Sequence, residues 1–303
     1  MSGGAPAQSK VVSRTSAAPW VGLSYVAVAV FFFSTTPVLI RYSAPFTAFE
    51  IGFIRLLVAS VVVGIMALLS GLSLRFARED YRKFAVYGLI TALHFLFYIA
   101  SLSFTSVTHS LALVYTAPVF VSLFSALMLR ETLPRAKYVG IAIAIIGVAI
   151  LAGFEPTVSP SMLFGDALAV GSAICFGLYS VAGRFERTSY PLLRYTFGVY
   201  GSAAVWLLPS ALIFQHQGPA IWEMDTRPLL SAVALGIFPL AIGHTLYNAS
   251  LRRIHATYVN LVATQEVTGG VLLGLIFLGE VPSLVSVVGA AVTLLGVALV
   301  LRN

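Results

Sequence analysis

Charged side chains are scarce in this chain. Lysine, arginine, aspartate and glutamate make up 10% of the 303 residues, whereas 59% of the residues are hydrophobic. The mean hydropathy is +0.95, and an ordinary soluble domain carries about 25% charged residues. This shortage of charge excludes an ordinary soluble globular protein. We therefore predict an integral membrane protein.

Several sequence signatures are also missing. The chain has a single cysteine, Cys175, so it cannot form an intrachain disulfide. It lacks a Walker A loop, which argues against direct ATP drive, and it lacks the H-E-x-x-H and G-x-S-x-G motifs. Histidines and carboxylates show no ligand or triad spacing, so we predict no metal, no cofactor and no enzyme activity. The net charge of +7 is spread between apolar runs, so we predict no nucleic-acid partner.

What the sequence does contain is a series of long apolar runs. About 20 apolar residues cross the hydrocarbon core as one helix, and by that rule ten segments qualify, which predicts an all-α fold with ten transmembrane helices. The first run, from Trp20 to Ile40, is too long for a signal-peptide core, so we predict that it is retained. The short connections leave no room for a soluble domain. The predicted spans are roughly residues 20–41, 46–70, 83–104, 108–129, 136–153, 163–184, 190–214, 229–251, 256–278 and 284–301.

Basic residues indicate how the spans are oriented. Arg41 and Arg227 stand alone in one set of loops, and Arg55 lies within a span. All the other basic residues fall in the N-terminal tail, in or beside the alternate loops, or at the C-terminus. An excess of lysine and arginine marks cytoplasmic loops, so we predict that both termini are cytoplasmic. The residues of this larger set are Lys10, Arg14, Arg75, Arg78, Arg82, Lys83, Arg130, Arg135, Lys137, Arg184, Arg187, Arg194, Arg252, Arg253 and Arg302.

Two stretches of the chain are similar to each other. Residues 113–131 read LVYTAPVFVSLFSALMLRE, and residues 262–280 read VATQEVTGGVLLGLIFLGE, 149 positions later. The same shift matches Tyr98 with Tyr247. We predict two copies of a five-helix unit, and because five is odd, the second copy is inverted in the membrane, a construction typical of transporters with a substrate site between the halves. The predicted parts are a cytoplasmic tail at residues 1–19 and the repeats at residues 20–153 and 163–301.

The two copies resemble a known family. In each, an apolar fourth helix ends in Leu-x-Glu before a glycine-rich fifth helix: LMLRETLP with GIAIAIIGVAIL, and IFLGEVP with GAAVTLLGVALV. Arg55-Leu56 also resembles an Arg-Phe pair often found in the second helix. In these features the chain is similar to the EamA-type drug/metabolite transporter superfamily. The resemblance implies transport rather than catalysis and, in bacteria, export of solutes such as amino acids across the cytoplasmic (inner) membrane. The chain departs from the family at Thr264-Gln265-Glu266-Val267, where the ninth helix often carries a proline.

Polar side chains form a stripe on the third predicted helix, at spacings of four and three that place them on one face. The eighth helix repeats this pattern in part. Such a face avoids lipid, so it forms an interhelical hydrogen-bond seam or lines a pathway, where tyrosines suit amphipathic or aromatic ligands. The pathway candidates are Tyr87, Thr91, His94, Tyr98 and Ser101 on the third helix, Tyr115 on the fourth, and His244, Tyr247 and Asn248 on the eighth.

Among the charged residues inside the predicted spans, three are candidates for a role in the membrane interior. Glu50, near the outer end of the second span, fits a solvated helix start or an ion-pair or coupling role. Arg55 lies deeper, where a lone guanidinium costs about 2.5–3.5 kcal/mol, so it needs a structural partner or a substrate anion. Glu266, near the middle of its span, fits three roles: a substrate-amine anchor or proton-coupling site, a neutral acid in a tight helix pair, or a partner of Arg55. Asn260 and Thr264 point nearly the opposite way from Glu266 unless the helix is distorted.

Prolines interrupt three spans. Pro37, Pro118 and Pro239 lie in the first, fourth and eighth, and each removes a backbone hydrogen bond. Such positions act as hinges or are simply tolerated in membrane helices, and we treat these three as hinge candidates.

Together these features predict a secondary transporter that exports small organic metabolites, such as amino acids or aromatic and amphipathic compounds, by alternating access. The expected partners are a small organic solute and the lipid bilayer, with protons as a candidate coupling ion beside plain facilitated exchange. A channel or a non-transporting membrane scaffold is the alternative, and an intramembrane enzyme is the weakest one. The sequence leaves both a monomer and a homodimer open.

Overall fold

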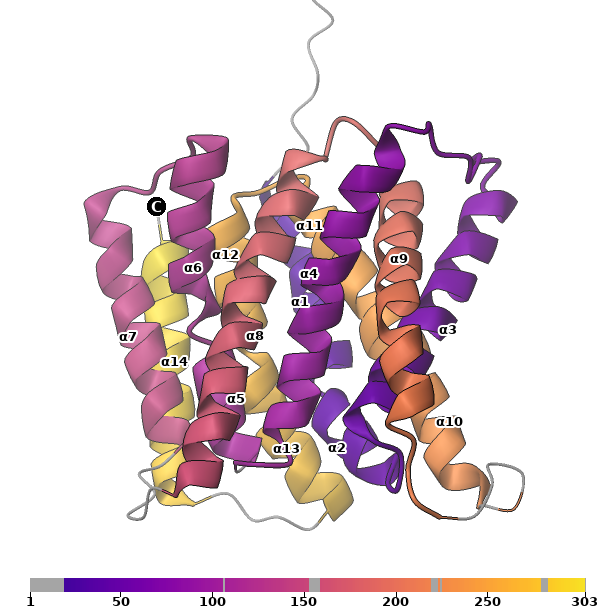
Figure 1. The fold of residues 1–303 in the computed structure, drawn as a ribbon. Helices are drawn as coiled ribbons and strands as arrows, with labels where there is room; N and C mark the ends of the chain where they lie inside the picture. Colours follow the sequence, from indigo (N-terminus) through magenta and orange to yellow (C-terminus); the bar gives the residue numbers. More distant parts are fainter. Residues whose placement is uncertain are drawn as a thin grey trace, which may run out of the picture.

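The computed structural model describes residues 19–105, 107–152, 159–218, 223, 225–278 and 283–302. Over these ranges the regular elements are all helical, with no strand. Figure 1 shows the helices running between two opposite ends of the molecule, where the connections lie. Residues 1–18 of the predicted tail, and Glu280 of the repeat pattern, lie outside the described residues.

The elements follow the order of the predicted spans, several of which are divided. The first half contains α1 (Pro19–Phe33), α2 (Thr36–Tyr42), α3 (Ala48–Leu69), α4 (Asp80–Ser101), α5 (Val107–Val114), α6 (Ala117–Phe124), the π-helix η1 (Ser125–Leu129) and α7 (Arg135–Ala152). The second half contains α8 (Pro160–Phe185), α9 (Leu192–Ile213), α10 (Thr226–Leu235), the π-helix η3 (Gly236–His244), α11 (Thr245–Leu251), α12 (Ala256–Ala263), α13 (Glu266–Leu278) and α14 (Leu284–Leu301).

Among the described residues, eight helical segments are long and apolar enough to cross a membrane. They coincide, within about one helical turn, with eight of the ten predicted spans. The other two predictions, residues 136–153 and 284–301, correspond to α7 and α14, which fall outside that set; the apolar part of α14, Val287–Leu301, is shorter. The protein is thus an all-helical integral membrane protein with eight candidate spans in its described part.

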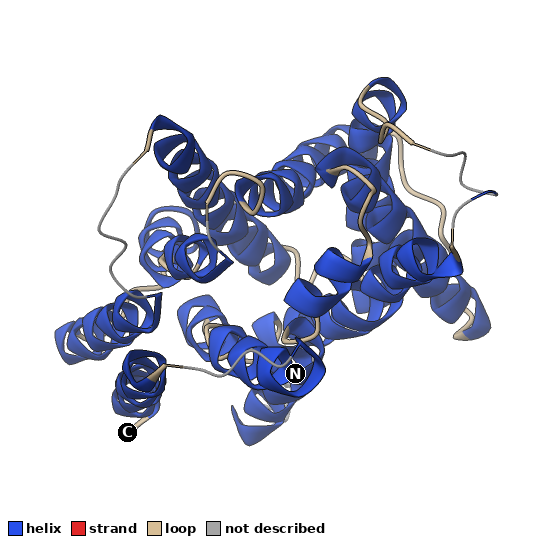
Figure 2. Ribbon diagram, turned by 90° about the horizontal axis from the view of Figure 1, so that it is seen from below, coloured by secondary structure: helices blue, strands red, loops and turns tan. Residues whose placement is uncertain are grey.

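α7 and α14 pack against each other at one side of the bundle (Figures 1 and 2). A Cβ added to Gly147 would lie 2.3 Å from the backbone nitrogen of Thr293, and one added to Gly296 would lie 2.3 Å from the nitrogen of Ala144. Glycine at both positions therefore permits the close approach of the two backbones. The two glycines are 149 positions apart, so each copy contributes the same residue to this helix crossing.

Three spans are interrupted near their middle. α1 gives way to α2 at residues 34–35, α5 to α6 at residues 115–116, and α12 to α13 at residues 264–265. At each break a threonine hydroxyl donates to the backbone carbonyl three residues earlier, at 2.7 Å, which compensates part of the backbone hydrogen bonding lost within a bilayer. The donors and acceptors are Thr35 to Phe32, Thr116 to Leu113 and Thr264 to Leu261.

The three predicted hinge prolines all lie at irregular points of the helices. Pro37 and Pro118 are in the first turns of α2 and α6, where a helix tolerates the missing N–H. Pro239 lies inside η3, so the span that contains α10 and α11 widens there without a break. Because the helical geometry changes at these points, they are suitable places for bending.

Candidate functional site

The breaks and η3 contribute to a small cavity inside the bundle, which we call the central cavity. Its volume is about 30 Å³, room for roughly two water molecules at about 10–15 Å³ each. Six of its residues were predicted from the sequence as pathway or ion-pair candidates: Arg55, His94, Tyr98, Tyr115, His244 and Glu266. The remaining lining residues are Phe33, Thr36, Phe95, Leu111, Val114 and Phe176.

Glu266 supplies the carboxyl group of the central cavity. It is the first residue of α13, directly after the break, and only 8% of it is exposed. The Tyr115 hydroxyl donates to its Oε2. Since Tyr115 lies at the break between α5 and α6, this hydrogen bond joins the interrupted helices of the two copies. The N-terminal end of a helix also favours a negative charge, because its first N–H groups have no partner within the helix.

Arg55, on α3, supplies the positive charge and is 1% exposed. Its guanidinium carbon lies 4.3 Å from the centre of the Phe95 ring, within the range of a cation–π contact. Nε and Nη1 have no hydrogen-bond partner among the described residues. Among the described residues, no ion pair within 4 Å joins Arg55 to Glu266. The cavity therefore contains a guanidinium and a carboxyl group that do not contact each other directly.

Tyr98 and two histidines complete the polar lining. The Tyr98 hydroxyl and Nδ1 of His244 are both buried, and neither has a hydrogen-bond partner in the described ranges. His94 is more constrained, because its Nδ1 lies 3.1 Å from the Ser172 carbonyl oxygen and its ring stacks on Phe176 with centroids 4.7 Å apart. Tyr98 and His244 thus have polar atoms available for a solute, whereas α8 already holds His94 in place.

Tyr247 and Asn248, also predicted as pathway residues, lie outside the central cavity. The Tyr247 hydroxyl is 2.6 Å from Ser180 Oγ and accepts a hydrogen bond from Asn260 at 3.1 Å. Asn248 donates to the Tyr179 hydroxyl at 2.5 Å. These bonds connect α11 with α8 and α12, so in this structure both residues belong to an interhelical seam. Of the repeat-related tyrosines, only the one on α4 lines the cavity.

Tyr87 and Glu50 lie toward opposite ends of the bundle. Tyr87 donates to Glu186 at 2.8 Å, near the end that carries most basic residues, which we call the basic end. At the other end, Glu50 accepts the Thr47 backbone N–H at 2.8 Å and completes a capping box that starts α3. The Glu50 carboxylate also lies 2.8 Å from Nδ1 of His216. Neither residue lines the central cavity.

The basic end is held together around Arg184, at the end of α8. Arg184 donates to Glu131 at 2.6 Å and to the carbonyls of Leu251 and Ile254 at 2.9 and 2.7 Å. His255 Nε2 lies 3.8 Å from Glu131. Burial lowers the pKa of the His255 imidazole, while Glu131 acts in the opposite direction. The neutral imidazole is therefore favoured at pH 7. The contacts of Arg184 connect the end of α8 with the loop that follows η1 and the loop between α11 and α12.

The aromatic part of the cavity lining is not predicted by the sequence. Phe33, Phe95 and Phe176 are unremarkable members of apolar runs, and no spacing distinguishes them. Thr36 carried a signal, because it lies in the Ser-Thr-Thr-Pro segment at the first break. Among the described residues, no group of three or more histidine, cysteine or acidic side chains is placed to hold a metal ion.

Interrupted helices that meet at a site between two repeats are typical of membrane transporters. The chain matches the model of the EamA-like transporter family over residues 20–153 and 163–302. It therefore belongs to the EamA-like transporter family, and the resemblance predicted from the Leu-x-Glu and glycine-rich segments is confirmed.

Relatives of the chain are transporters from bacteria and archaea. It is 26% identical over 258 residues to the uncharacterized transporter YxxF of Bacillus subtilis, covering 84% of this chain and 81% of the relative. It is 28% identical over 208 residues to the threonine/homoserine exporter RhtA of Escherichia coli K12, covering 68% and 66%. An uncharacterized transporter of Archaeoglobus fulgidus is 26% identical over 287 residues, covering 94% and 99%. A protein crystal structure with 21% identity matches the fold with a TM-score of 0.77, over 92% of this chain and 96% of the other.

Proposed function

We propose that this protein exports small zwitterionic metabolites of the amino-acid type by alternating access. The observation that carries the proposal is the presence of two buried, complementary groups, the carboxyl group of Glu266 and the guanidinium of Arg55, around one cavity without direct contact. A carboxylate complements an ammonium group, and a guanidinium binds a carboxylate through two parallel hydrogen bonds. A solute that carries both groups satisfies both charges. A solute with only one leaves a buried charge unpaired, which is strongly unfavourable.

The relatives and the lining support the substrate class and the direction. RhtA of Escherichia coli is named as an exporter of threonine and homoserine, both of which are amino acids. The rings of Phe33, Phe95 and Phe176 next to the charges suit an apolar or aromatic side chain on the solute. These observations favour outward transport of amino acids with apolar, aromatic or amphipathic side chains.

The proposed topology has ten spans in two inverted five-helix repeats, at residues 20–153 and 163–301, with both termini in the cytoplasm of a bacterium. α7 and α14 supply the two spans beyond the eight candidates, which is supported by their close pairing at Gly147 and Gly296. The basic end, where most of the lysines and arginines lie, is the cytoplasmic end. The membrane is then the bacterial inner membrane.

The proposed movement separates the lining of the central cavity. A volume of about 30 Å³ is far below the roughly 300–1,000 Å³ of ordinary ligand pockets, so the structure corresponds to a contracted state around the site. The breaks at residues 34–35, 115–116 and 264–265 and the π-helix η3 are the proposed hinges, with Pro37, Pro118 and Pro239 at or beside them. Opening toward the cytoplasm has to release the contacts of Arg184 at the basic end.

Substrate counterflow in proteoliposomes tests this function. We would load unlabelled amino acids and small cations in turn and compare wild type with Glu266→Gln, using Glu79→Gln as the matched control because Glu79 is exposed outside the cavity. We expect a counterflow peak for an amino acid that Glu266→Gln loses and Glu79→Gln keeps, with both variants monodisperse. A pH gradient then shows whether Glu266 also exchanges a proton for the substrate. Channel-like flux without a counterflow peak would contradict the proposal.

A further inference from the structure

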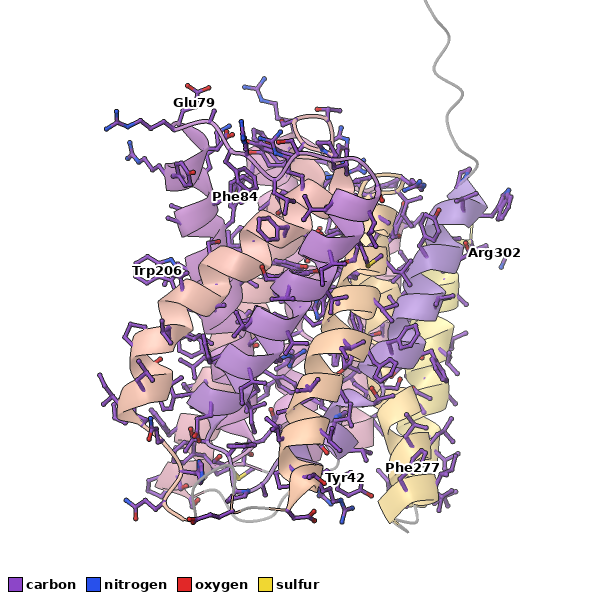
Figure 3. All side chains as sticks on the ribbon, turned by 90° about the vertical axis from the view of Figure 1, so that its right-hand side faces the viewer. Tyr42, Glu79, Phe84, Trp206, Phe277 and Arg302 are labelled. Atoms are coloured by element: carbon purple, nitrogen blue, oxygen red, sulfur yellow. The ribbon has the colours of Figure 1, made fainter. Side chains whose placement is uncertain are left out.

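A second hollow lies on the flank of the bundle and shares no lining residue with the central cavity. We call it the flank groove. It lies between α4 and α9, beside Phe76 of the connection that precedes α4, and its volume is about 700 Å³. Figure 3 places Phe84 and Trp206 of the groove on one flank, below Glu79 at the basic end. Its size is within the range of roughly 300–1,000 Å³ for sites that hold small molecules.

The flank groove presents a mainly apolar surface. On α9, Gly198 lets the Phe84 and Phe76 rings of the groove pack directly against the helix backbone, because an added Cβ would lie 2.6 Å from Phe84 and 2.9 Å from Phe76. Two polar side chains of the groove are already hydrogen-bonded: Trp206 Nε1 donates to the Ala85 carbonyl at 2.9 Å, and the Ser202 hydroxyl donates to a carbonyl of α4 at 2.7 Å. A ligand in the groove therefore makes mainly apolar contacts, and few hydrogen-bonding groups are available to it.

The flank groove opens to the surroundings of the bundle. Val205 is 69% exposed and Trp206 is 49% exposed, and both lie within the span Leu192–Ile213. Large apolar side chains exposed along a membrane span face lipid chains. The adjoining medium is thus hydrocarbon, and a lipid acyl chain is the guest that can enter from it without losing hydration.

Basic side chains lie at the end of the flank groove. Arg75, Arg78 and Arg82 are exposed, and none forms an ion pair with a described residue. Of the two acids between them, Asp80 accepts a hydrogen bond from Tyr190 at 2.5 Å and another from a backbone N–H at 3.0 Å. This end of the groove therefore carries an excess of available positive charge.

Charge also decides between the candidate occupants. A second copy docked on this face by twofold symmetry would bring the same basic residues of both copies to one interface, with repulsion between them. Anionic lipids, by contrast, accumulate in the cytoplasmic leaflet and are attracted by basic residues at the membrane surface. Under the sidedness proposed above, the arginines lie at that leaflet.

We propose that the flank groove binds one anionic phospholipid, with an acyl chain between α4 and α9 and its phosphate at Arg75 and Arg78. α4 also carries Tyr98 of the central cavity, so the lipid lies against a helix that has to move during transport. The site is independent of the substrate, and it can exist whether or not the protein exports amino acids.

Native mass spectrometry of the detergent-solubilised full chain tests this site, with phosphatidylglycerol and phosphatidylethanolamine as probes. We expect one phosphatidylglycerol per chain, bound at least about tenfold more tightly than phosphatidylethanolamine. Arg75→Gln with Arg78→Gln removes the phosphate contacts, and Val205→Trp fills the groove at an exposed position. Each change is expected to weaken phosphatidylglycerol binding about tenfold.

The matched control is Arg135→Gln with Arg302→Gln, which removes two exposed charges from the basic end away from the groove. We expect the control to change binding by less than about twofold, and all variants to elute as monodisperse protein. If the two double variants weakened phosphatidylglycerol binding equally, the binding would depend on the overall positive charge of the basic end, and the proposed site would be wrong. Equal affinity for the two lipids, or a dimer that Val205→Trp dissociates, would also overturn it.

Discussion

The fourth helices of the two copies, α5–α6 and α12–α13, break at equivalent positions. The breaks at residues 115–116 and 264–265 are 149 positions apart, the shift that relates the two copies. The residues around them differ. The first copy has Ala117 and Pro118, both buried, after its break, whereas the second has Glu266 and Val267 in the equivalent positions. Only Glu266 of these four lines the central cavity.

The comparison shows that proline is not required for the break. Both breaks instead share a threonine hydroxyl that donates to a carbonyl three residues earlier at 2.7 Å, from Thr116 in one copy and Thr264 in the other. The two hydroxyls differ by one position in the repeat register. The symmetric element is therefore the interrupted helix, and the asymmetric element is the charge placed at it. The first copy contributes the hydrogen-bond donor Tyr115 and the second contributes the acceptor.

The largest effect is expected from moving the carboxylate between the copies. Glu266→Ala leaves a substrate ammonium group without its partner, and truncating one side of a buried charge pair costs about 2–5 kcal/mol, so we expect counterflow to fall roughly 100-fold. Adding Ala117→Glu to this variant should not restore transport, because Ala117 is fully buried and outside the cavity lining. Recovery in the double variant would show that the two copies are interchangeable at the site.

The next effect concerns the π-helix η3, whose equivalent residues in the first copy lie in the regular helix α4. The position equivalent to Pro239 is Ile90, within the regular helix α4. Pro239→Ala allows η3 to regain a regular hydrogen bond, and since proline disturbs a helix by about 3 kcal/mol or more, the bent form should lose population. We expect transport, measured by counterflow, to drop at least about tenfold. Size-exclusion chromatography should show that the variant folds normally. Unchanged transport would remove Pro239 from the hinges.

A smaller loss is expected from the hydrogen bond between the copies. Tyr115→Phe removes the donor to Glu266 but keeps the ring, and a hydrogen bond to a charged group is worth about 1.5–3 kcal/mol. We expect the KM for substrate to change roughly tenfold, with protein yield and monodispersity close to wild type. The control is Tyr247→Phe, which removes a hydroxyl of the interhelical seam. If both changes affect KM alike, the hydroxyl of Tyr115 has no special role.

The smallest effect is expected at Pro118. Because the second copy breaks without a proline, Pro118→Ala should leave the first break in place, and transport should change less than about threefold. Thermal unfolding should shift little, since Pro118 lies in the first turn of α6, where a helix needs no N–H donor. A loss as large as that of Pro239→Ala would mean that proline maintains the first break.

Much of the fold follows from the sequence, because span length and the placement of basic residues are local properties. Eight predicted spans have their counterparts in the structure. Glu266 and Arg55 were candidates because charge inside a span is costly wherever the helix packs. The contact of Tyr115 with Glu266 could not be predicted, since it depends on how α5 approaches α13. The repeat gave a partial indication of this contact. Tyr115 and Thr264 are equivalent positions at the two breaks, so Tyr115 and Glu266 both lie close to a break.

The polar stripe on α4 shows what helical periodicity does not predict. Tyr87, His94 and Tyr98 share a face of α4, but the face is long enough to meet different neighbours along its length. Tyr87 contacts Glu186 away from the cavity, whereas both His94 and Tyr98 line the cavity, and His94 is also held by α8. The position of a side chain on a helical face predicts whether it avoids lipid. Which of these side chains reach the cavity depends on the neighbouring helices at that height of the bundle.

The most direct test of two complementary charges is competition against counterflow by three forms of one transported amino acid: the free acid, its methyl ester and its N-acetyl derivative. Wild type should prefer the free acid to both derivatives by at least about tenfold. Arg55→Gln should lose only the discrimination against the ester, and Glu266→Gln only the discrimination against the N-acetyl form. If both variants lost both preferences equally, or if wild type accepted all three forms alike, the assignment of separate roles to Arg55 and Glu266 would be wrong.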